Sequence, residues 1–261
     1  GKRPFLVVAS AGTTNTGAVD PLWRVAEVCA DEGLWFHVDA AYGGAFVLCD
    51  DGRARLRGIG CADSVTFDPH KGLLLPFGTG CLLVRDGRRL RAAHDAHGAY
   101  LQDFDHAERG DEVPSPTLPG PELSRSARGL RLWLPLVVHG AAAFRVALAE
   151  KLELAASLHA QLVARIDAGA PLEIAAPTEL SIVTFRLRRR DGEDLSAWNS
   201  RNAALLAAVN APRRVYLSST SLPATGGEAF TLRACVLGLR THADRVDALL
   251  DDLDAALAAT P

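Results

Sequence analysis

The chain has 261 residues, of which 48% are hydrophobic and 23% charged, and its formal net charge is −3. This apolar content can build one large domain or two small ones, and the small net charge favours neither nucleic acid nor an anionic membrane as a partner. No uninterrupted apolar run reaches the ~18–20 residues of a membrane span, no signal peptide is visible, and the five scattered cysteines predict a reducing cytoplasm without disulfides or a zinc site.

The first part of the chain has the pattern of a strand, a helix and a second strand. Residues 4–10 predict a buried strand and residues 12–17 a polar turn. A helix follows, with Asp20 as its N-cap and Gly33 at its end. The second strand begins at Leu34, so the unit predicts a parallel sheet covered by helices. Cofactors bind beyond the carboxyl ends of the strands in such sheets.

The second strand carries a carboxylate at its carboxyl end. Strand side chains alternate, so His37, Asp39 and Ala41 should share one face. A buried carboxylate needs a partner, and the protonated pyridine nitrogen of pyridoxal phosphate is one candidate. An arginine partner or a helix cap explains Asp39 equally well. His37 fits a core histidine as well as a catalytic one.

A single lysine follows the next expected strand, at residues 62–67. Asp68 and Pro69 turn the chain out of the sheet and Lys71 comes directly after His70. The chain has 25 arginines but only three lysines, at positions 2, 71 and 151. Lysine can lose its proton and attack a carbonyl, whereas arginine cannot, so Lys71 is a candidate nucleophile. The alternative is an exposed lysine in a loop.

Six short motifs stand in a characteristic order along the chain. They are AGTTNTG at 11–17, HVDAAY at 37–42, DPHK at 68–71, RGLRLW at 128–133, LSST at 217–220 and LRTH at 239–242. In this order and spacing the chain resembles the group II pyridoxal-phosphate-dependent decarboxylases, which include aromatic-L-amino-acid, glutamate and histidine decarboxylases. The resemblance implies an α/β protein with the aspartate-aminotransferase-like fold of fold type I.

The resemblance also implies a role for four residues. Lys71 would attach the cofactor through its aldehyde, and Asp39 would pair with the pyridine nitrogen and keep the ring an electron sink. Ala41 would pack flat against the ring, and Thr14 would contact the cofactor. These residues would lie together at the carboxyl ends of the strands.

The segment around Lys71 departs from the family pattern at two positions. His70 would contact the phosphate or stack near the attached cofactor. The family usually has Asn where Asp68 stands and Trp where Gly72 stands. A carboxylate beside a phosphate is repelled unless it is protonated or bridged, so the resemblance assigns Asp68 to the cofactor site through its backbone.

Residues 88–120 are polar and predict an irregular segment, which is usually functional or disordered in a compact domain. In the family a loop here closes over the substrate, and Tyr100 matches its tyrosine, which returns a proton to Cα after CO2 leaves. A phenylalanine there marks aldehyde-forming relatives. The alternative for Tyr100 is an aromatic anchor for the loop. The histidines at 94, 97 and 106 lack helical metal-ligand spacing, so no metal site is predicted.

The rest of the chain predicts a second unit. Residues 73–85 predict a hairpin and residues 123–166 two helices, and beyond residue 170 strands and helices alternate as in a small α+β domain. We expect a partial cofactor-binding large domain at 1–149 and a small α+β domain at 150–261. The absence of methionine and the early first strand indicate a fragment that lacks an upstream half.

The expected function is decarboxylation of an L-amino acid to an amine and CO2, with Lys71, His70 and Tyr100 as catalytic residues. The family implies a homodimer, and the sequence does not define which amino acid is the substrate. The rivals are another fold type I reaction, such as that of an aminotransferase, a carbon–sulfur lyase or a sphingosine-phosphate lyase, and a fragment inactive on its own. A dinucleotide enzyme is disfavoured because its glycine fingerprint is missing.

Overall fold

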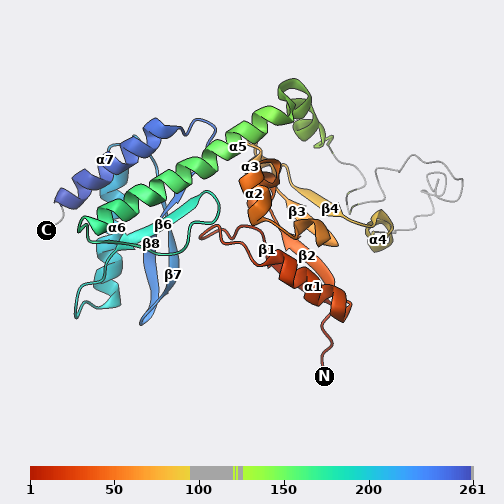
Figure 1. Ribbon diagram of the computed structural model, residues 1–261, viewed down its shortest axis with the longest axis horizontal. Helices are drawn as coiled ribbons and strands as arrows, with labels where there is room; N and C mark the ends of the chain where they lie inside the picture. Colours follow the sequence, from red (N-terminus) through yellow and green to blue (C-terminus); the bar gives the residue numbers. More distant parts are fainter. Residues whose placement is uncertain (95–119, 121, 123–125, 260–261) are drawn as a thin grey trace, which may run out of the picture.

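The computed structural model describes residues 1–94, 120, 122 and 126–259. The described residues form two four-stranded sheets, one near each end of the chain, and a long helix passes over both (Figure 1). Each sheet has its own hydrophobic cluster of buried side chains.

The first sheet has the order β1-β2-β3-β4. Strands β1 (Leu6–Ser10), β2 (Trp35–Asp39) and β3 (Ser64–Phe67) are parallel, as expected, and β4 (Cys81–Val84) runs antiparallel to β3. The predicted alternation in β2 is confirmed, because Phe36 and Val38 are buried while Asp39 is exposed.

Helix α1 (Leu22–Glu32) joins β1 to β2 and ends, as predicted, at Gly33, which has a left-handed φ of 63°. The prediction that Asp20 caps this helix is wrong: Pro21 is the N-cap residue, and the Asp20 carboxylate instead accepts a hydrogen bond from the backbone N–H of Ser10. Three short helical segments connect β2 to β3: η1 (Gly43–Leu48), α2 (Asp50–Arg55) and η2 (Ile59–Cys61).

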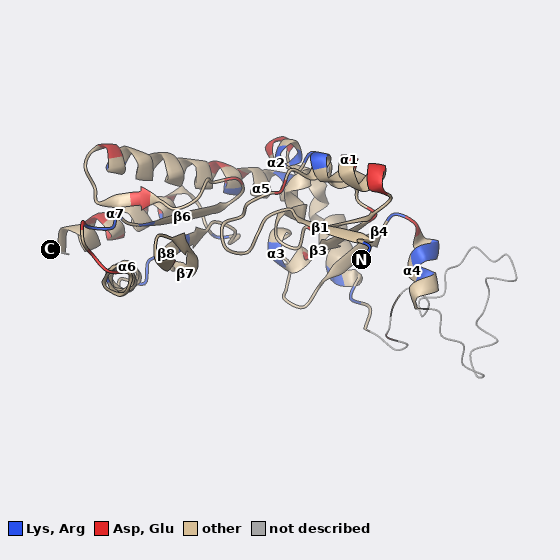
Figure 2. Cartoon of the chain, turned by 90° about the horizontal axis from the view of Figure 1, so that it is seen from below, with Lys and Arg blue, Asp and Glu red and all other residues tan. Residues whose placement is uncertain are grey.

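The segment after β3 differs from the expected hairpin. Asp68 leads into a one-turn helix, α3 (Pro69–Gly72), and only residues 81–84 of the expected hairpin form a strand. Leu73 is buried in the first core, and Leu74 has a left-handed φ of 60°, so the apolar run turns sharply and does not extend. The expected irregular segment begins with a helix, α4 (Gly87–Ala93), whose arginines are visible in Figure 2.

Helix α5 (Leu130–Asp167) takes the place of the two expected helices. Gly140 interrupts it with φ 73° and ψ 153°, which is a kink that glycine tolerates at little steric cost. The boundary expected between residues 149 and 150 falls inside this helix. Its buried residues pass from the first core, at Leu148 and Leu152, to the second core, from Leu154 onward.

The second sheet is antiparallel with the order β5-β6-β8-β7. Its strands are β5 (Leu172–Ile174), β6 (Ile182–Leu187), β7 (Ser218–Ala224) and β8 (Gly227–Cys235). Helices α6 (Leu195–Asn210) and α7 (Ala243–Ala259) pack with α5 around this sheet, and α7 lies beside α5 in Figure 1. This arrangement of antiparallel strands and helices is of the α+β type.

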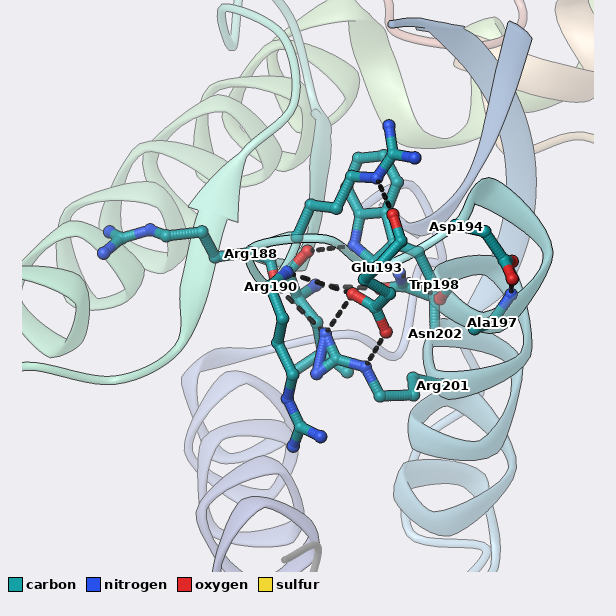
Figure 3. Close-up of polar contacts among 10 residues, drawn as sticks. Arg188, Arg190, Glu193, Asp194, Ala197, Trp198, Arg201 and Asn202 are labelled. Atoms are coloured by element: carbon teal, nitrogen blue, oxygen red, sulfur yellow. Dashed lines mark hydrogen bonds and ion pairs between the residues drawn. The ribbon is translucent and has the colours of Figure 1, made fainter. Parts of the chain in front are cut away.

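The start of α6 is fixed by side chains of the preceding charged turn (Figure 3). The Asp194 carboxylate accepts the backbone N–H of Ala197, which is an N-cap bond. Arg201 forms an ion pair with Glu193 at 2.7 Å, and the indole N–H of Trp198 donates to the Leu187 carbonyl. Arg201 of α6 also donates to the backbone carbonyl of Arg188, so it holds the turn after β6 to α6.

Two apolar surfaces are open in the described part of the chain. One face of the first sheet lines a groove of about 630 Å³ that includes Leu6, His37 and Leu82. The N-terminal half of α5 exposes several large apolar side chains: Leu130, Trp133, Leu134, Val137, Val138 and Val146. By length and composition α5 is the one described helix that could cross a membrane. A count of uninterrupted apolar residues misses this because polar residues such as His139 interrupt the run.

Candidate active site

The three parallel strands end at one edge of the first sheet. The backbone N–H of Ala11 donates to the Asp39 carbonyl at 2.8 Å, and the N–H of Ala40 donates to the Thr66 carbonyl at 3.0 Å. The segments that follow β1, β2 and β3 therefore start side by side. They hold the Thr14 turn, Asp39 with Ala41, and Asp68 with Lys71, as the βαβ pattern predicts.

Asp39 is exposed at the end of β2, and one of its carboxylate oxygens accepts the backbone N–H of Ala41 at 3.1 Å. The alternative of an arginine partner has no support among the described contacts of this side chain. His37 lies on the same strand face, with Nδ1 2.8 Å from the Ser64 hydroxyl and Nε2 3.2 Å from the Thr66 hydroxyl. Both ring nitrogens are thus engaged by the neighbouring strand, which favours a structural role for His37.

Lys71 lies in α3, with its side chain 42% exposed. Its ammonium is 2.8 Å from a carboxylate oxygen of Asp68, and Asp68 accepts no hydrogen bond that would cap α3. The alternative of an exposed loop lysine does not hold, because Lys71 lies in a helix and pairs with the residue three positions before it. The amine is accessible to a carbonyl compound at the edge where the strands end.

His70 is fixed by a backbone carbonyl. Its Nδ1 lies 2.7 Å from the carbonyl oxygen of Thr79, and since a carbonyl can only accept, Nδ1 carries a proton. In the neutral ring Nε2 is then an acceptor. The ring also meets Phe77 edge to face, with centroids 5.0 Å apart, and Phe77 is 87% exposed. His70 is thus oriented by the residue 77–79 loop.

The turn after β1 is built as the sequence predicts for hydroxyl side chains. The hydroxyls of Thr13 and Thr16 are 3.0 Å apart, and Thr13 also accepts the N–H of Ala18. The plain-turn interpretation therefore holds for Thr13 and Thr16. Thr14 is exposed and its hydroxyl has no partner among the described residues, so it is available to a ligand.

Sequence reasoning missed Arg233 of β8. Its Nε donates to the backbone carbonyls of Thr14, at 3.0 Å, and Asn15, at 3.2 Å, across more than 200 residues of sequence. A guanidinium from the second sheet therefore fixes the turn after β1. The only signal in the sequence was a single charged residue in the otherwise uncharged run 229–237, where a charge must find a partner.

The packing around Gly72 leaves no room at this position for the tryptophan that the resemblance would place there. A Cβ placed there would lie 2.4 Å from the Cβ of Ala45, which is much closer than van der Waals contact. Helix α3 therefore packs directly on η1. The close approach sets the position of Lys71, which directly precedes Gly72.

These residues fit pyridoxal phosphate. Lys71 supplies an accessible amine, and Asp39 has a carboxylate oxygen free among the described contacts. Ala41 is small and half-buried beside Asp39, and the Thr14 hydroxyl can donate to an anionic oxygen. Asp68 is the exception, because its carboxylate repels a phosphate and already pairs with Lys71.

Tyr100 lies outside the described residues, so its assignment stays a prediction. His97 and His106 also lie outside them, whereas His94 is at the C-terminal end of α4. Among the described residues, no three His, Cys, Asp or Glu side chains gather in a way that could hold a metal ion.

Known proteins with this sequence pattern are numerous. An aromatic-L-amino-acid decarboxylase of Bacillus atrophaeus is 37% identical over 246 residues, covering 94% of this chain and 49% of that protein. The enzyme of the same name from Bos taurus is 33% identical, covering 85% and 43%. The chain thus spans about half the length of these curated relatives.

Solved structures of decarboxylases have the same fold as this chain. The crystal structure of Oryza sativa TDC with PLP and tryptamine has a TM-score of 0.82 at 28% identity, covering 97% of this chain and 50% of that one. The Catharanthus roseus tryptophan decarboxylase in complex with L-tryptophan has a TM-score of 0.79 at 28% identity, with the same two coverages. The predicted α/β class and fold type I are therefore confirmed.

The model of the pyridoxal-dependent decarboxylase conserved domain matches residues 1–188, which include every described residue of the candidate site except Arg233. With the strand ends, the exposed amine of Lys71 and the carboxylate of Asp39 at one edge, the chain belongs to the pyridoxal-dependent decarboxylase family.

Proposed function

We propose that this chain carries the lysine anchor and ring-nitrogen partner of a pyridoxal-phosphate-dependent decarboxylase that converts an L-amino acid to its amine and CO2. The observation that carries the proposal is the placement of Lys71 and Asp39 at the carboxyl ends of neighbouring parallel strands. Bound pyridoxal phosphate supplies an aldehyde that captures amines and a ring that accepts the electron pair left when CO2 departs.

Each residue has a separate task in this proposal. Lys71 attaches the cofactor, and Asp39 holds a proton on the pyridine nitrogen. Ala41 leaves room for the flat ring, and Thr14 donates its hydroxyl to an anionic oxygen of the cofactor. His70 offers Nε2 beside Lys71, because Nδ1 is committed to the Thr79 carbonyl.

The proposed substrate class is the aromatic L-amino acids. Support comes from relatives named aromatic-L-amino-acid decarboxylase and tryptophan decarboxylase, each at least 30% identical to this chain. The exposed ring of Phe77 beside His70 adds an apolar surface next to the lysine. Because the chain spans about half of these relatives, residues outside it complete the substrate pocket in this proposal.

A homodimer is part of the proposal. The exposed apolar side chains on the N-terminal half of α5, Trp133 and Val137 among them, form a surface of the kind that protein partners cover. The partner in this proposal is a second copy, and the assembly acts in the cytoplasm without a membrane or nucleic acid. Size measurement by light scattering, with Trp133→Glu as the disrupting variant, tests the assembly.

The function is tested first by cofactor capture. The chain is mixed with pyridoxal phosphate and treated with borohydride, and the modified peptide is identified by mass spectrometry. We expect one phosphopyridoxyl group on Lys71 and none in Lys71→Ala, whereas attachment at Lys2 alone would refute the proposal. The chain offers Lys2, exposed near the N-terminus, as an internal control.

If no adduct forms, either the site in this chain is incomplete or the assignment is wrong, and a second protein distinguishes the two. The chain is extended with the upstream half of the Bacillus atrophaeus relative and tested again. Capture by the extended chain supports the proposal with an incomplete site, and failure of both refutes it. The extended chain then receives L-tryptophan: tryptamine with CO2 is expected, while a keto acid would indicate an aminotransferase.

A further inference from the structure

The ion pair between Asp68 and Lys71 is a feature of this chain that the family pattern does not supply. The two groups are 2.8 Å apart, and the Asp68 side chain is 18% exposed while that of Lys71 is 42% exposed. Each is the other's only charged partner among the described residues. The resemblance implies a neutral asparagine at this position, whereas this chain has a carboxylate.

The Asp68 carboxylate is not used to cap α3 and can therefore pair with Lys71. Asp68 is the N-cap residue of α3, but its side chain accepts no backbone N–H there, and its backbone carbonyl accepts the N–H of Lys71. The carboxylate therefore turns toward the ammonium at position i+3. On the other side, the Gly80 backbone lies close, so that a Cβ added there would meet Asp68 Oδ1 at 3.4 Å.

An amine held in this way is a poor nucleophile. Attack on a carbonyl needs the nitrogen lone pair, and in an ammonium that donates to a carboxylate this pair is bound to a proton. A partly exposed ion pair of this kind contributes little to the free energy of folding. Its contribution to stability therefore does not explain why a carboxylate stands beside this lysine. It does compete directly with any electrophile that approaches Lys71.

We propose that the Asp68 carboxylate withholds the amine of Lys71 from electrophiles, so that Asp68 is a positioning residue that limits how readily this lysine captures a carbonyl compound. The inference rests on the proposed function for the identity of the captured compound, but the behaviour of the amine does not depend on it. Capture of the cofactor then exchanges an ion pair for a covalent bond.

The test measures the reactivity of Lys71 without any cofactor. The chain is treated briefly with N-acetoxysuccinimide, and acetylation at each lysine is quantified by mass spectrometry. The ammonium first gives a proton to the buffer, and its nitrogen then attacks the acyl carbon. N-hydroxysuccinimide leaves as its anion, and the buffer takes a second proton. With only three lysines, Lys2 serves as the exposed reference and the fully buried Lys151 reports unfolding.

The ratio of acetylation at Lys71 to that at Lys2 should rise about two- to fivefold in Asp68→Asn, the change that loss of such an ion pair corresponds to. Asp68→Glu, which keeps a carboxylate, should stay near the original ratio. Asp86→Asn is the matched control, because Asp86 is also an N-cap aspartate but pairs with Arg88. If Asp68→Asn exposes Lys151 to the reagent, Asp68→Ala is used in its place.

An unchanged ratio in the neutral variants overturns the proposal, as does an equal rise in Asp86→Asn. Borohydride trapping with pyridoxal, which lacks the phosphate, and with pyridoxal phosphate gives a second readout. Faster trapping of both aldehydes in Asp68→Asn supports the proposal. Faster trapping of pyridoxal phosphate alone, with unchanged acetylation, shows that Asp68 opposes the phosphate, and overturns it. Raised acetylation without any trapping, in this chain and in the extended chain alike, refutes the proposed function and leaves the role of Asp68 standing.

Discussion

The hydroxyl oxygens of Tyr42 and Ser181 lie 2.6 Å apart, in a buried hydrogen bond between the two halves of the described chain. Tyr42 directly follows the Asp39–Ala41 segment of the candidate site, and Ser181 directly precedes β6. Burial raises the pKa of the Tyr42 phenol above its ordinary value, so the phenol is protonated at neutral pH. The bonds from Arg233 to the Thr14 turn link the same two parts of the chain. Together these contacts hold the cofactor edge, the edge of the first sheet near Thr14, Asp39 and Lys71, against the second sheet.

The bond between Tyr42 and Ser181 should show up as a coupling energy. Tyr42→Phe leaves the fully buried Ser181 hydroxyl without the phenol, and Ser181→Ala removes the hydroxyl that lies 2.6 Å from the buried phenol, so each should cost about 1–3 kcal/mol. The double variant should cost less than the sum by about 1 kcal/mol, because neither group is then unsatisfied. Urea denaturation of the four proteins measures the cycle. Strict additivity would contradict the structural bond.

Glu150 should make stability depend on pH. Its carboxylate binds Nδ1 of His242 at 2.6 Å and the ammonium of the fully buried Lys151 at 2.8 Å. These two hydrogen bonds, that of His242 first, lower the pKa of Glu150. A lowered pKa gives stability that is fully present above the unfolded value, about 4.3, and is lost as pH falls through the folded value.

Glu150→Gln should therefore destabilise the chain at pH 7 by about 1–2 kcal/mol, because the Glu150 side chain is partly exposed and Lys151 keeps its bond to the Thr241 carbonyl. This corresponds to a melting temperature lower by roughly 2–8 °C. The difference from the original chain should shrink below about pH 4. Glu27→Gln, an exposed change on α1, is the control and should leave the melting temperature unchanged at both pH values.

Gly72→Ala should destabilise the chain by about 1–3 kcal/mol, since the new methyl group would press on the Cβ of Ala45. The variant Gly72→Ala with Ala45→Gly removes the opposing methyl group and should recover part of this loss. Denaturant midpoints of the three proteins measure the effect. A neutral Gly72→Ala would mean that α3 can move away from η1 at no cost.

Asp39→Asn should separate attachment of the cofactor from catalysis. Asparagine keeps the size of the side chain but has no negative charge to hold a proton on the pyridine nitrogen. Under the proposed function, we expect decarboxylation by the extended chain to fall on the order of 10²–10³-fold, while borohydride still attaches the cofactor to Lys71. Product assays and peptide mapping check the two halves of this prediction. Asp31→Asn, an exposed change on α1, should alter neither.

Tyr100→Phe should divert the reaction from the amine to a carbonyl product, if Tyr100 returns the proton to Cα. A phenylacetaldehyde synthase of Arabidopsis thaliana is among the relatives, at 32% identity over 223 residues, so an aldehyde-forming chemistry exists on this sequence pattern. Chromatography of the products from L-tryptophan measures the ratio of amine to aldehyde. A normal amine yield would show that the assignment of Tyr100 is wrong.

The sequence predicted the elements whose side chains follow a clear period. The expected alternation of strands and helices beyond residue 170 is present, and α6 begins directly after Asp194, whose carboxylate caps it. The strand ends that carry Asp39 and Lys71 were predictable because buried strands are short apolar runs and a βαβ unit makes them parallel. These local patterns defined most of the cofactor edge.

The rest depended on contacts between distant parts of the chain. The run Leu73–Leu75 resembles a strand, yet Leu73 is buried in the first core and Leu74 adopts a left-handed backbone conformation that no apolar pattern encodes. Asp20 resembles an N-cap, but the neighbouring strand uses its carboxylate. The contact of Arg233 with the Thr14 turn spans 219 residues, so only the folded chain brings the two together.

Helix α5 also sets how the second core is rotated relative to the first about the helix axis. Leu152 belongs to the first core and Leu154 to the second, with no loop between them. One residue inserted between these leucines would turn everything after it by about 100° and shift it by about 1.5 Å along the helix axis. The Tyr42–Ser181 bond and the Arg233 contacts would then miss their partners. The number of residues in α5 therefore helps to determine the geometry of the candidate site, although none of the residues proposed to hold the cofactor lies in this helix.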